Sequence, residues 1–552
     1  MLDSRHRQLL DEGTELFSKS QNLINLFQEL AENFYPERAD FTVRRDLGEE
    51  FASNLDTSYP IIARRDLGNA FGAMLRPSSK QWFHNRAKRG VIEDEPARQW
   101  LAMTDRVQTR AIYDRESNFV RATKEADHDF ATFGQAVLSS EPAISPTSGP
   151  ILLHRDWHLR DVRWTEDSYG QINAVHRRWE PGARELKNRF PGKVCKDVLK
   201  LAKKEPFKTV KVRHIVVAAH NYEKKFRQPY VSIYLDVDNE HLLEEVGSWN
   251  KIYVIPRWET VSGSQYAYSP AAIAALPDAR LVQAMTYTLL TAGEFAVEPP
   301  MIGVQEAIKG GIEVFPGGFT AVDAQYDERL GEVLRPLYKG GENSIPLGLE
   351  MNQDAKRSIA DAFYLTKLAL PEAGQGGMSP MEVNLRIQEF IRQALPLFEP
   401  MEQDYNGALM EMDFDILLRG GAFGPASNIP ESLQGKDTEF RFESPLSDSI
   451  DKLKVQIFLE TKGLMVEAAA LDPLSVQMVD VRSALRDALH GGGTPPNWMR
   501  TEDQMEDIEA AEAEKQKVQE LLGQVSAGAQ VAEQIGAAGQ ALAPEPPVQE
   551  GA

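Results

Sequence analysis

The sequence predicts an α+β protein that is mainly helical and contains several domains. Apolar residues recur at three- and four-residue steps over residues 1–135 and again after residue 270, the period of helices packed on one face. Between residues 135 and 260, short apolar runs alternate with turn residues, as in β-rich structure. The length of 552 residues is more than one hydrophobic core usually supports.

The first region, residues 1–135, is expected to be helical. Apolar positions within 23–30 share one helix face, and Tyr35-Pro36 should end that helix because the residue before a proline disfavours helical angles. A further helix is expected from Ile61 to Leu75, before Pro77. Charged helices bearing aromatic residues should continue to about Phe133.

The second region, about 135–260, should contain short strands. The expected strands are Ala136–Ser139, Ile151–His154, Val162–Trp164, Ile172–Trp179, Val210–His220, Tyr230–Asp236 and Lys251–Arg257. Tyr169-Gly170 lies between two of these runs and suggests a hairpin. A short basic helix should interrupt the strands near Ala183–Arg189.

Two long helices are expected to bracket residues 299–345, which are rich in glycine and proline. The first covers roughly 270–297, with Pro277 at the start of its main part, where a missing N–H is harmless. Its Leu281, Met285 and Leu289 form one stripe. Glu298-Pro299-Pro300 should end it. This pattern describes a finger-like hairpin that projects from a body.

The second helix of the hairpin is expected from about Gly348 to Leu370. The positions expected on one face are Met351, Ala355, Ile359, Phe363, Thr366 and Leu370, and those expected on other faces are Asn352, Lys356, Arg357 and Asp361. Residues 371–377 cannot continue a helix and predict a mobile loop.

A new helix should start after this loop, with Ser379 as N-cap, Pro380 at the first position and Glu382 completing a capping box. A strand at Glu439–Glu443 and a helical region over 446–490 follow. Beyond residue 501, eleven acids face two lysines, which predicts a helix to about Leu522 and then a flexible tail.

The bulk composition excludes several classes of protein. Cys195 is the single cysteine, so no intrachain disulfide is possible, which fits a reducing cytoplasm. The first residues lack the apolar core of a signal peptide, and no apolar run reaches 18 residues, so no membrane span is expected. The net charge of -21 argues against tight DNA binding but permits a protein past which DNA slides. Taken alone, acidity more often means solubility.

No motif predicts an enzyme, a metal site or a cofactor. The sequence contains no P-loop, no GxSxG and no HExxH. Asp236-Val-Asp238 begins like a calcium loop, but His241 occupies the sixth position where glycine is needed, so a charged turn is favoured. His154 and His158 flank Asp156 but lack a third ligand, which favours half-exposed strand histidines.

Two further candidates are weak. Cys195 has cationic neighbours that lower a thiol pKa, but no histidine is close in sequence, so a nucleophile is disfavoured. A basic run could touch nucleic acid or a partner, although such runs are usually solvated surface. Its residues are Lys203, Lys204, Lys208, Lys211 and Arg213, with Lys224, Lys225 and Arg227 beyond them.

Seven segments carry a family resemblance. They are Arg64–Phe83, Asn118-Phe119 with Asp129–Gly134, Trp164–Trp179, Val254–Tyr268, Leu276–Pro300, Met378–Glu389 and Pro495–Arg500. In this order, over about 50–510, they resemble the head-to-tail connector (portal) family of T7-like and related podoviruses. Pro277 stands where the family more usually has glycine, and Ser379-Pro380 replaces Thr-Ala. Both departures suit helix starts.

The resemblance implies the portal fold in a ring of twelve subunits. The parts implied are a wing at 1–268, stem helix 1 at 269–298, a clip at 299–346, stem helix 2 at 347–370, a tunnel loop at 371–378, a wing helix and strand at 379–444, a helical crown at 445–510, and a C-terminal helix with a flexible tail at 511–552. The function implied is a capsid-vertex channel for packaging and ejecting double-stranded DNA. The alternative is another virion structural protein, such as a tail or scaffold component, without a DNA channel.

The resemblance also implies partners and a site. The partners are the terminase large subunit, tail adaptor or nozzle proteins, and the major capsid and scaffold proteins, with the subunit in the virion and, during assembly, in the host cytoplasm. The tunnel-loop residues expected to meet DNA are Leu370, Pro371, Glu372, Ala373, Gly374, Gln375, Gly376 and Gly377. Possible channel cations are Lys356, Arg357 and Lys367, which could instead pair with Asp354 or Asp361 of a neighbouring subunit.

Overall fold

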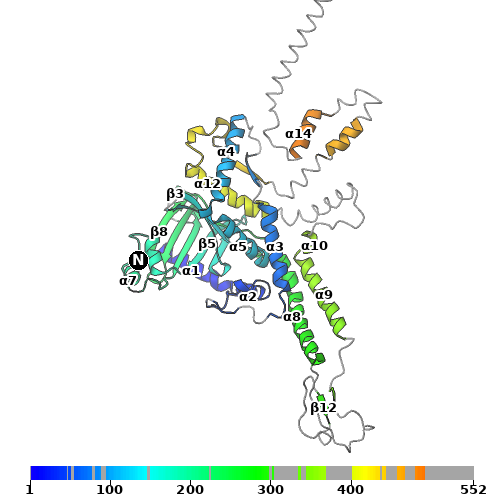
Figure 1. The fold of residues 1–552 in the computed structure, drawn as a ribbon. Helices are drawn as coiled ribbons and strands as arrows, with labels where there is room; N and C mark the ends of the chain where they lie inside the picture. The colour runs from blue at the N-terminus through cyan, green and yellow to red at the C-terminus, as the bar shows by residue number, and fades with distance from the viewer. Residues whose placement is uncertain are drawn as a thin grey trace, which may run out of the picture. The chain divides into compact units, whose positions relative to one another are not determined.

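The computed structural model shows a mainly helical α+β protein (Figure 1). It divides into two compact units, Met1–Ser449 and Ile450–Ala552. The residues that the structure describes are 2–46, 48–50, 55–77, 81–88, 95–145, 149–222, 226–297, 301–303, 334–336, 344–368, 401–435, 438–442, 455, 457–465 and 479–491.

The helices and strands follow the order that the sequence predicts. The α-helices of the first unit are α1 (Ser4–Lys19), α2 (Gln21–Phe34), α3 (Tyr59–Leu75), α4 (Glu95–Ile112), α5 (Phe119–Phe133), α6 (Ala183–Arg189), α7 (Lys196–Lys204), α8 (Pro270–Val297), α9 (Ser344–Ala362), α10 (Leu365–Leu368) and α12 (Ala408–Arg419), and a π-helix, η7, spans Glu402–Gly407. The strands are β1 (Phe83–Ala87), β2 (Leu138–Ser145), β3 (Gly149–Asp156), β4 (Val162–Glu166), β5 (Ile172–Trp179), β6 (Val212–Ala218), β7 (Tyr230–Asp236), β8 (His241–Ser248), β9 (Tyr253–Val254), β10 (Glu259–Thr260), β11 (Ala267–Tyr268), β12 (Met301–Gly303), β13 (Leu334–Pro336) and β14 (Thr438–Phe442).

The main core joins the N-terminal helices to the base of α8. α2 ends at Phe34, immediately before Tyr35-Pro36, as the sequence predicts. Phe34 is fully buried and meets Phe363 edge-on, with ring centroids 5.2 Å apart. Since these two residues are more than 300 positions apart, the core ties the start of the chain to the end of α9.

An antiparallel sheet of five strands, in the order β4-β5-β6-β7-β8, forms the β-rich part. A second sheet has the order β3-β2-β9. The β4–β5 hairpin turns at Tyr169-Gly170, and Gly170 has a φ of +73°, which glycine adopts without strain. The strands predicted at Ile172–Trp179 and Tyr230–Asp236 match β5 and β7 in both bounds.

Some elements escape the sequence patterns. β8 is an edge strand whose charged, half-exposed residues hide its alternation, and β1 is recognisable only by its pairing with β14, in which Phe83 faces Phe442. The run Lys251–Arg257 was expected to be a full strand but provides only the two residues of β9. α7 was also not expected.

The two long helices differ in detail from the prediction. α8 begins at Pro270, so Pro277 lies inside the helix and not at its start. Ser269 caps α8, since its Oγ accepts a hydrogen bond from Ala272 N at 3.1 Å. Three alanines before Pro277, Ala271, Ala272 and Ala275, are buried in the main core, and this packing holds the helix together although Pro277 lacks one backbone hydrogen bond.

α9 begins at Ser344, earlier than the predicted Gly348, with Pro346 in its first turn where proline is tolerated. The helix does not run unbroken toward Leu370. Tyr364 has a φ of +59° between α9 and α10, a conformation that ends regular helix. Residues 369–400, which include the whole of the predicted loop at 371–377 and the start of the helix predicted after Ser379, lie outside the described residues.

The second unit is described over short stretches. Residues 457–465 are helical, and α14 spans Val481–Gly491, one residue past the end of the helical region predicted at 446–490. The predicted C-terminal helix and tail lie outside the described residues. Among the described residues, no helix combines the length and apolar character that a membrane crossing needs.

Candidate functional site: the α8–α9 hairpin

α8 and α9 pack side by side as an antiparallel hairpin (Figure 1). Gly348 lies against Leu289, where an added Cβ would come within 2.8 Å of the Leu289 Cδ2 atom. One turn further, Asn352 Nδ2 donates to Thr286 Oγ1 at 3.2 Å. Because the two pairs run in opposite directions along the helices, the chain reverses between them. β12 and β13 pair antiparallel beyond the helix ends.

The buried side chains of the two helices are mostly small or branched and belong to the main core. The fully or almost fully buried residues are Ala275, Ala279 and Val282 of α8 and Ala355, Ile359 and Phe363, which lie on or just after α9. Alanines allow the two backbones to approach closely. In the predicted stripe of Leu281, Met285 and Leu289, Leu289 lies against Gly348, whereas the Leu281 side chain is 47% exposed. The stripe is therefore covered by α9 at Leu289 but not at Leu281.

The predicted face of α9 is also corrected in part. Ala355, Ile359 and Phe363 are buried as expected, but Met351 is 52% exposed. Asn352, expected on another face, is buried, and its side chain donates a hydrogen bond to Thr286 across the seam between α8 and α9. A polar side chain in a seam needs such a partner, which sequence spacing does not reveal.

The outer surface of the hairpin is unusually apolar. Its exposed large side chains are Ile273, Leu281, Tyr287, Leu290, Phe295 and Val297 of α8 and Leu347, Leu349 and Met351 of α9. Tyr287 and Leu290 are 64% and 57% exposed. A helix that is apolar all round is normally buried, and contiguous exposed apolar surface marks an interaction site. The hairpin therefore offers a face that the described part of its own chain does not cover.

Polar contacts fix the base of the hairpin to the body. Gln283 Oε1 accepts hydrogen bonds from the backbone N–H groups of Asp56 and Thr57 at 2.8 and 3.0 Å, and its Nε2 donates to Thr57 O at 3.0 Å. Arg280 on α8 forms an ion pair with Glu29 on α2. These contacts set the direction in which α8 leaves the body.

A buried histidine fastens the segment after residue 400. The His154 Nε2 atom faces Asp413 Oδ1 at 3.0 Å, and His154 Nδ1 faces the Ser117 carbonyl at 3.2 Å. Burial alone lowers the pKa of His154, but the Asp413 carboxylate raises it above its ordinary value overall. Because both ring nitrogens face acceptors, the imidazolium form fits this site, and the pair joins β3 to α12.

A second buried ion pair holds the π-helix. Arg76, just after α3, pairs with Asp127 of α5, and its Nη1 atom donates to Asn406 Oδ1 at 2.7 Å. The Arg76 guanidinium also lies 4.7 Å from the ring centroid of the buried Tyr405. η7 is thus bound to two helices far from it in sequence, which explains how an irregular helix persists there.

Comparison with known proteins decides the family. A family described as "Bacteriophage head to tail connecting protein" matches residues 7–499, most of the chain. The chain belongs to this family of connector proteins. The portal protein of Salmonella phage epsilon15 is 19% identical over 547 residues, covering 97% of this chain and 96% of that protein.

A solved structure is also similar in part. A chain from the virion of a native gene transfer agent (GTA) particle aligns with a TM-score of 0.36 and 9% identity, covering 74% of this chain and 86% of that chain. The family membership rests on the sequence match and not on this likeness. Membership of this family makes the protein a portal, the structural connector between the head and tail of a bacteriophage particle.

The residues predicted for the portal channel are placed as follows. Lys356 lies 5.9 Å from the Tyr59 ring centroid, a cation–π contact with α3. Arg357 is exposed and pairs at 3.1 Å with Asp354 of its own helix. Lys367 is on α10, and its side chain is outside the described residues, as are Leu370 to Gly377. Which of these residues meets DNA stays a prediction.

The exposed apolar residues of the hairpin, such as Tyr287 and Leu290, were not predicted as functional. The signal was present in the sequence, since residues 281–297 contain apolar side chains on every side of the helix and few charges. Arg76, Asp127 and Asp413 were missed for a different reason. They lie far apart in sequence, and only the fold brings them to their partners.

The weak metal and nucleophile candidates contact other residues of the body. His154 is fully buried on β3, and His158 lies beyond the end of that strand beside Asp40, so neither is a half-exposed strand histidine. Among the described residues, no cluster of His, Cys, Asp and Glu could hold a metal ion. Asp236 accepts from Asn239 N at 3.1 Å in the β7–β8 turn, the charged turn that was favoured. Cys195 lies 3.9 Å from Asp236 at the start of α7.

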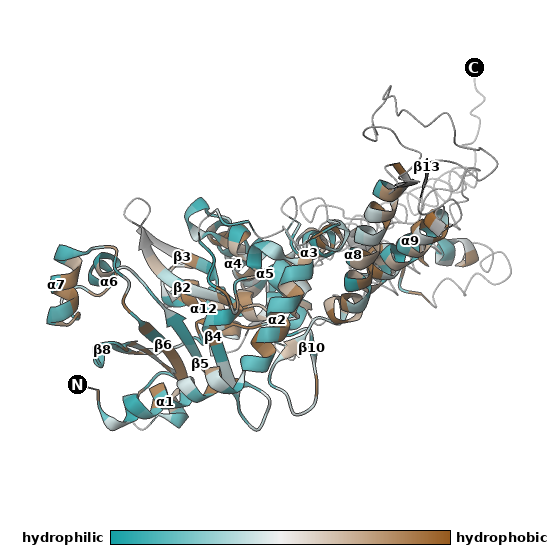
Figure 2. Cartoon of the chain, turned by 90° about the horizontal axis from the view of Figure 1, so that it is seen from below, coloured by the Kyte–Doolittle hydropathy of each residue, from teal (hydrophilic) through white to brown (hydrophobic). Residues whose placement is uncertain are grey.

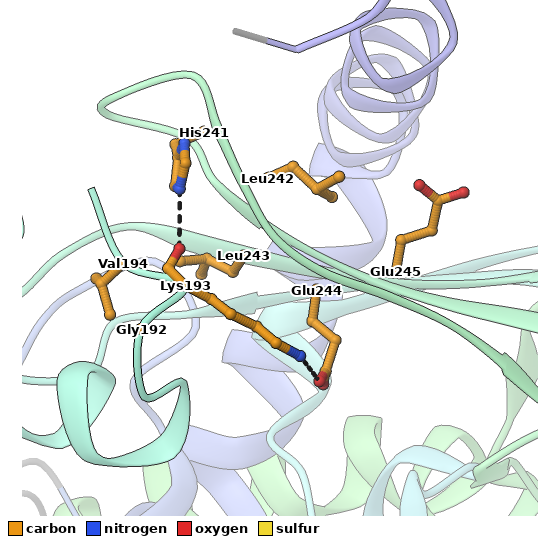
Figure 3. Close-up of a pocket in the computed structure, with 8 residues that line it drawn as sticks. All are labelled: Gly192, Lys193, Val194, His241, Leu242, Leu243, Glu244 and Glu245. Atoms are coloured by element: carbon orange, nitrogen blue, oxygen red, sulfur yellow. Dashed lines mark hydrogen bonds and ion pairs between the residues drawn. The ribbon is translucent and has the colours of Figure 1, made fainter.

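A shallow depression lies between β8 and the connection from α6 to α7 (Figure 3). Lys193 Nζ pairs with Glu244 Oε1 at 2.7 Å, and His241 Nε2 donates to the Lys193 carbonyl at 2.8 Å. Glu245 accepts from Tyr222 Oη at 3.0 Å. The charged groups on this wall are already engaged with one another or with the body, so the depression has the character of a packing groove.

Proposed function

We propose that this portal subunit assembles into a ring, expected to contain twelve copies, whose channel conducts double-stranded DNA. The observation that carries the proposal is the apolar outer surface of the α8–α9 hairpin, which includes Tyr287 and Leu290. A ring buries such a surface against the same hairpin of the next subunit, and head-to-tail contacts close into rings when the rotation permits.

The charge of the hairpin suits a channel wall. Residues 270–297 and 344–368 together contain four cationic and five acidic side chains. A wall with few free cations makes few phosphate contacts, and phosphate contacts are what hold a protein on DNA. DNA would therefore slide past the hairpin without being trapped.

The proposal extends to the parts of the chain. α8 and α9 serve as the stem, the segment around β12 and β13 as the clip, residues 371–378 as the tunnel loop, and the body built from 1–268 and 379–444 as the wing. The crown at 445–510, a helix with a flexible tail at 511–552, and contacts with terminase, tail adaptor, capsid and scaffold proteins belong to the same proposal. The role is structural, not catalytic, and is exercised at the portal vertex after assembly in the host cytoplasm.

Electron microscopy of the purified full-length protein tests the proposal. We expect rings with a central hole, and sedimentation at a mass of many subunits. A protein that remains monomeric at high concentration under all conditions would contradict it and favour a virion component without a channel.

A further inference from the structure

Residues 183–211, here named the α6–α7 lobe, are strongly basic in an acidic chain. They contain ten lysine and arginine residues and three acidic ones, whereas the whole chain has a net charge of -21. The lobe has a small core of its own around Leu186, Phe190 and Val198, packed on Tyr234 of the sheet. It lies at the far side of the five-stranded sheet from α8 and α9 (Figure 2).

Four lysines of α7 share one face. Successive residues in a helix are rotated by about 100°, so Lys196, Lys200, Lys203 and Lys204 fall within an arc of about 100°. All four are exposed. We name this set the α7 lysine stripe. Val198 faces the other way and is buried in the lobe core, with Leu201 packed against that core.

The α7 lysine stripe is largely free of ion pairs. Within the part of the chain that the structure describes, Lys196, Lys203 and Lys204 have no acidic partner. Lys200 pairs with Asp197 at 3.0 Å, but both side chains are 73% exposed. Exposed pairs of this kind contribute little and exchange readily for another anion. The stripe is therefore available to an external ligand.

The residues after α7 extend this surface. Lys208 is exposed and pairs loosely with Glu205 at 3.6 Å, and Lys211 is exposed. Phe207 is 78% exposed, with the Arg184 guanidinium 4.9 Å from its ring centroid. Arg213, part of the same basic run in the sequence, is buried on β6 and does not belong to the surface.

We propose that the α7 lysine stripe binds the phosphate backbone of double-stranded DNA outside the channel. That this protein meets such DNA rests on its proposed function as a portal. Lysines act as point charges that match a repeating line of phosphates without requiring a base sequence. A protein partner fits less well, because protein interfaces are depleted of lysine. A membrane surface also fits less well, since Val198, Leu201 and Ala202 of α7 already pack in the lobe core.

The acidity of the rest of the chain does not prevent this contact. At physiological ionic strength the Debye length is about 8 Å, so charges farther away are largely screened. The local excess of cations then determines which ligand approaches the lobe. The α7 lysine stripe would bind DNA outside the ring, whereas the hairpin would make few contacts with DNA in the channel.

The test compares DNA binding by the full-length protein and a variant with Lys196→Gln, Lys200→Gln, Lys203→Gln and Lys204→Gln. The probe is a DNA duplex of about 30 base pairs with mixed base composition. Its binding is measured at salt concentrations from low to physiological. Each lost phosphate contact reduces the slope of log affinity against log salt by about 0.9, so we expect the slope to fall by about 3–4 and the affinity at low salt to fall on the order of 100-fold.

A matched control removes four exposed cations elsewhere. It carries Lys19→Gln, Arg44→Gln, Arg65→Gln and Arg121→Gln, side chains that are 57–84% exposed. We expect the control to bind DNA nearly as the unaltered protein does. Equal losses in both variants would show a general charge effect and overturn the inference.

Other outcomes separate the inference from the proposed function. No binding of the duplex at low salt, or unchanged binding after loss of the α7 lysine stripe, overturns the inference. Stronger binding of polyglutamate or of anionic phospholipid vesicles than of DNA also overturns it, in favour of those partners. Electron microscopy of the same samples reports ring formation independently, so rings without DNA binding would contradict only the inference.

Discussion

The α8–α9 hairpin and the α6–α7 lobe differ in the kind of side chain that they expose to solvent. The hairpin exposes large apolar residues such as Tyr287 and is nearly balanced in charge, whereas the lobe buries Leu186 and Phe190 and exposes lysines. Both are helical pairs attached to the same body. The difference indicates different neighbours, other copies of the chain for the hairpin and a polyanion for the lobe.

The largest effect is expected from charging the hairpin surface. Tyr287→Asp combined with Leu290→Asp would place two unpaired carboxylates where we propose that subunits meet, and burying such charges costs several kcal/mol per interface. We expect rings to be lost in electron micrographs. Because both side chains are exposed within one subunit, the circular dichroism spectrum should not change.

The lobe provides the control for this prediction. Phe207 is more exposed than Tyr287 or Leu290, yet it lies in the lobe. Phe207→Asp should leave the rings intact. Rings that survive in the hairpin variant, or that disappear equally in both variants, would show that exposed apolar area alone does not identify the subunit contact.

The body that carries both regions differs from them, because it contains buried pairs of titratable side chains. His154→Gln removes the buried partner of Asp413 and should lower the free energy of unfolding by about 3–5 kcal/mol at pH 6. The folded pKa of His154 is raised, so the stabilisation is full below the ordinary histidine pKa and is lost as pH rises through the raised value. The loss caused by His154→Gln should therefore shrink toward pH 9.

Urea unfolding at pH 6 and pH 9 measures this difference. His220→Gln, at an exposed histidine, is the matched control and should have little effect at either pH. A loss that is the same at both pH values would mean that His154 acts as a neutral packing residue.

A smaller and more local effect is expected in the lobe core. Leu186 is fully buried, and Leu186→Ala should destabilise the lobe by about 2–5 kcal/mol. Because the lobe core is separate from the main core, hydrogen exchange should accelerate in α6 and α7 while rings still form. Lys187→Ala, at the exposed neighbour, should change neither property. Faster exchange throughout the first unit would show that the lobe is not an independent part.

The sequence predicted the elements whose signals are local. β5 and β7 have the predicted bounds because alternating apolar residues and turn residues mark them, and α2 ends where Tyr35-Pro36 predicts. The sequence patterns failed where neighbours in space decide. Pro277 lies within α8 because three alanines before it, Ala271, Ala272 and Ala275, are buried in the main core, and β1 is a strand because β14 lies beside it.

The candidate site shows the same division. The helix–insert–helix order and the basic run were predicted from residues alone. The buried seam of Ala275 and Ile359, and the separation of Arg213 from the exposed lysines, were not. A helical period shows that one face is apolar, but when residues 281–297 are apolar on every side it cannot show which face the chain covers.

The sequence by itself determined the helical hairpin, the strand-rich part of the body and the family to which the chain belongs. Only the tertiary structure decided which apolar residues of α8 are left exposed, that His154 is buried against Asp413, and that Lys196, Lys203 and Lys204 of α7 have no acidic partner among the described residues. The physical reason is that periodicity and turn residues act over a few positions, whereas burial and ion pairing depend on residues that lie far apart in the sequence, such as His154 and Asp413 at 259 positions apart.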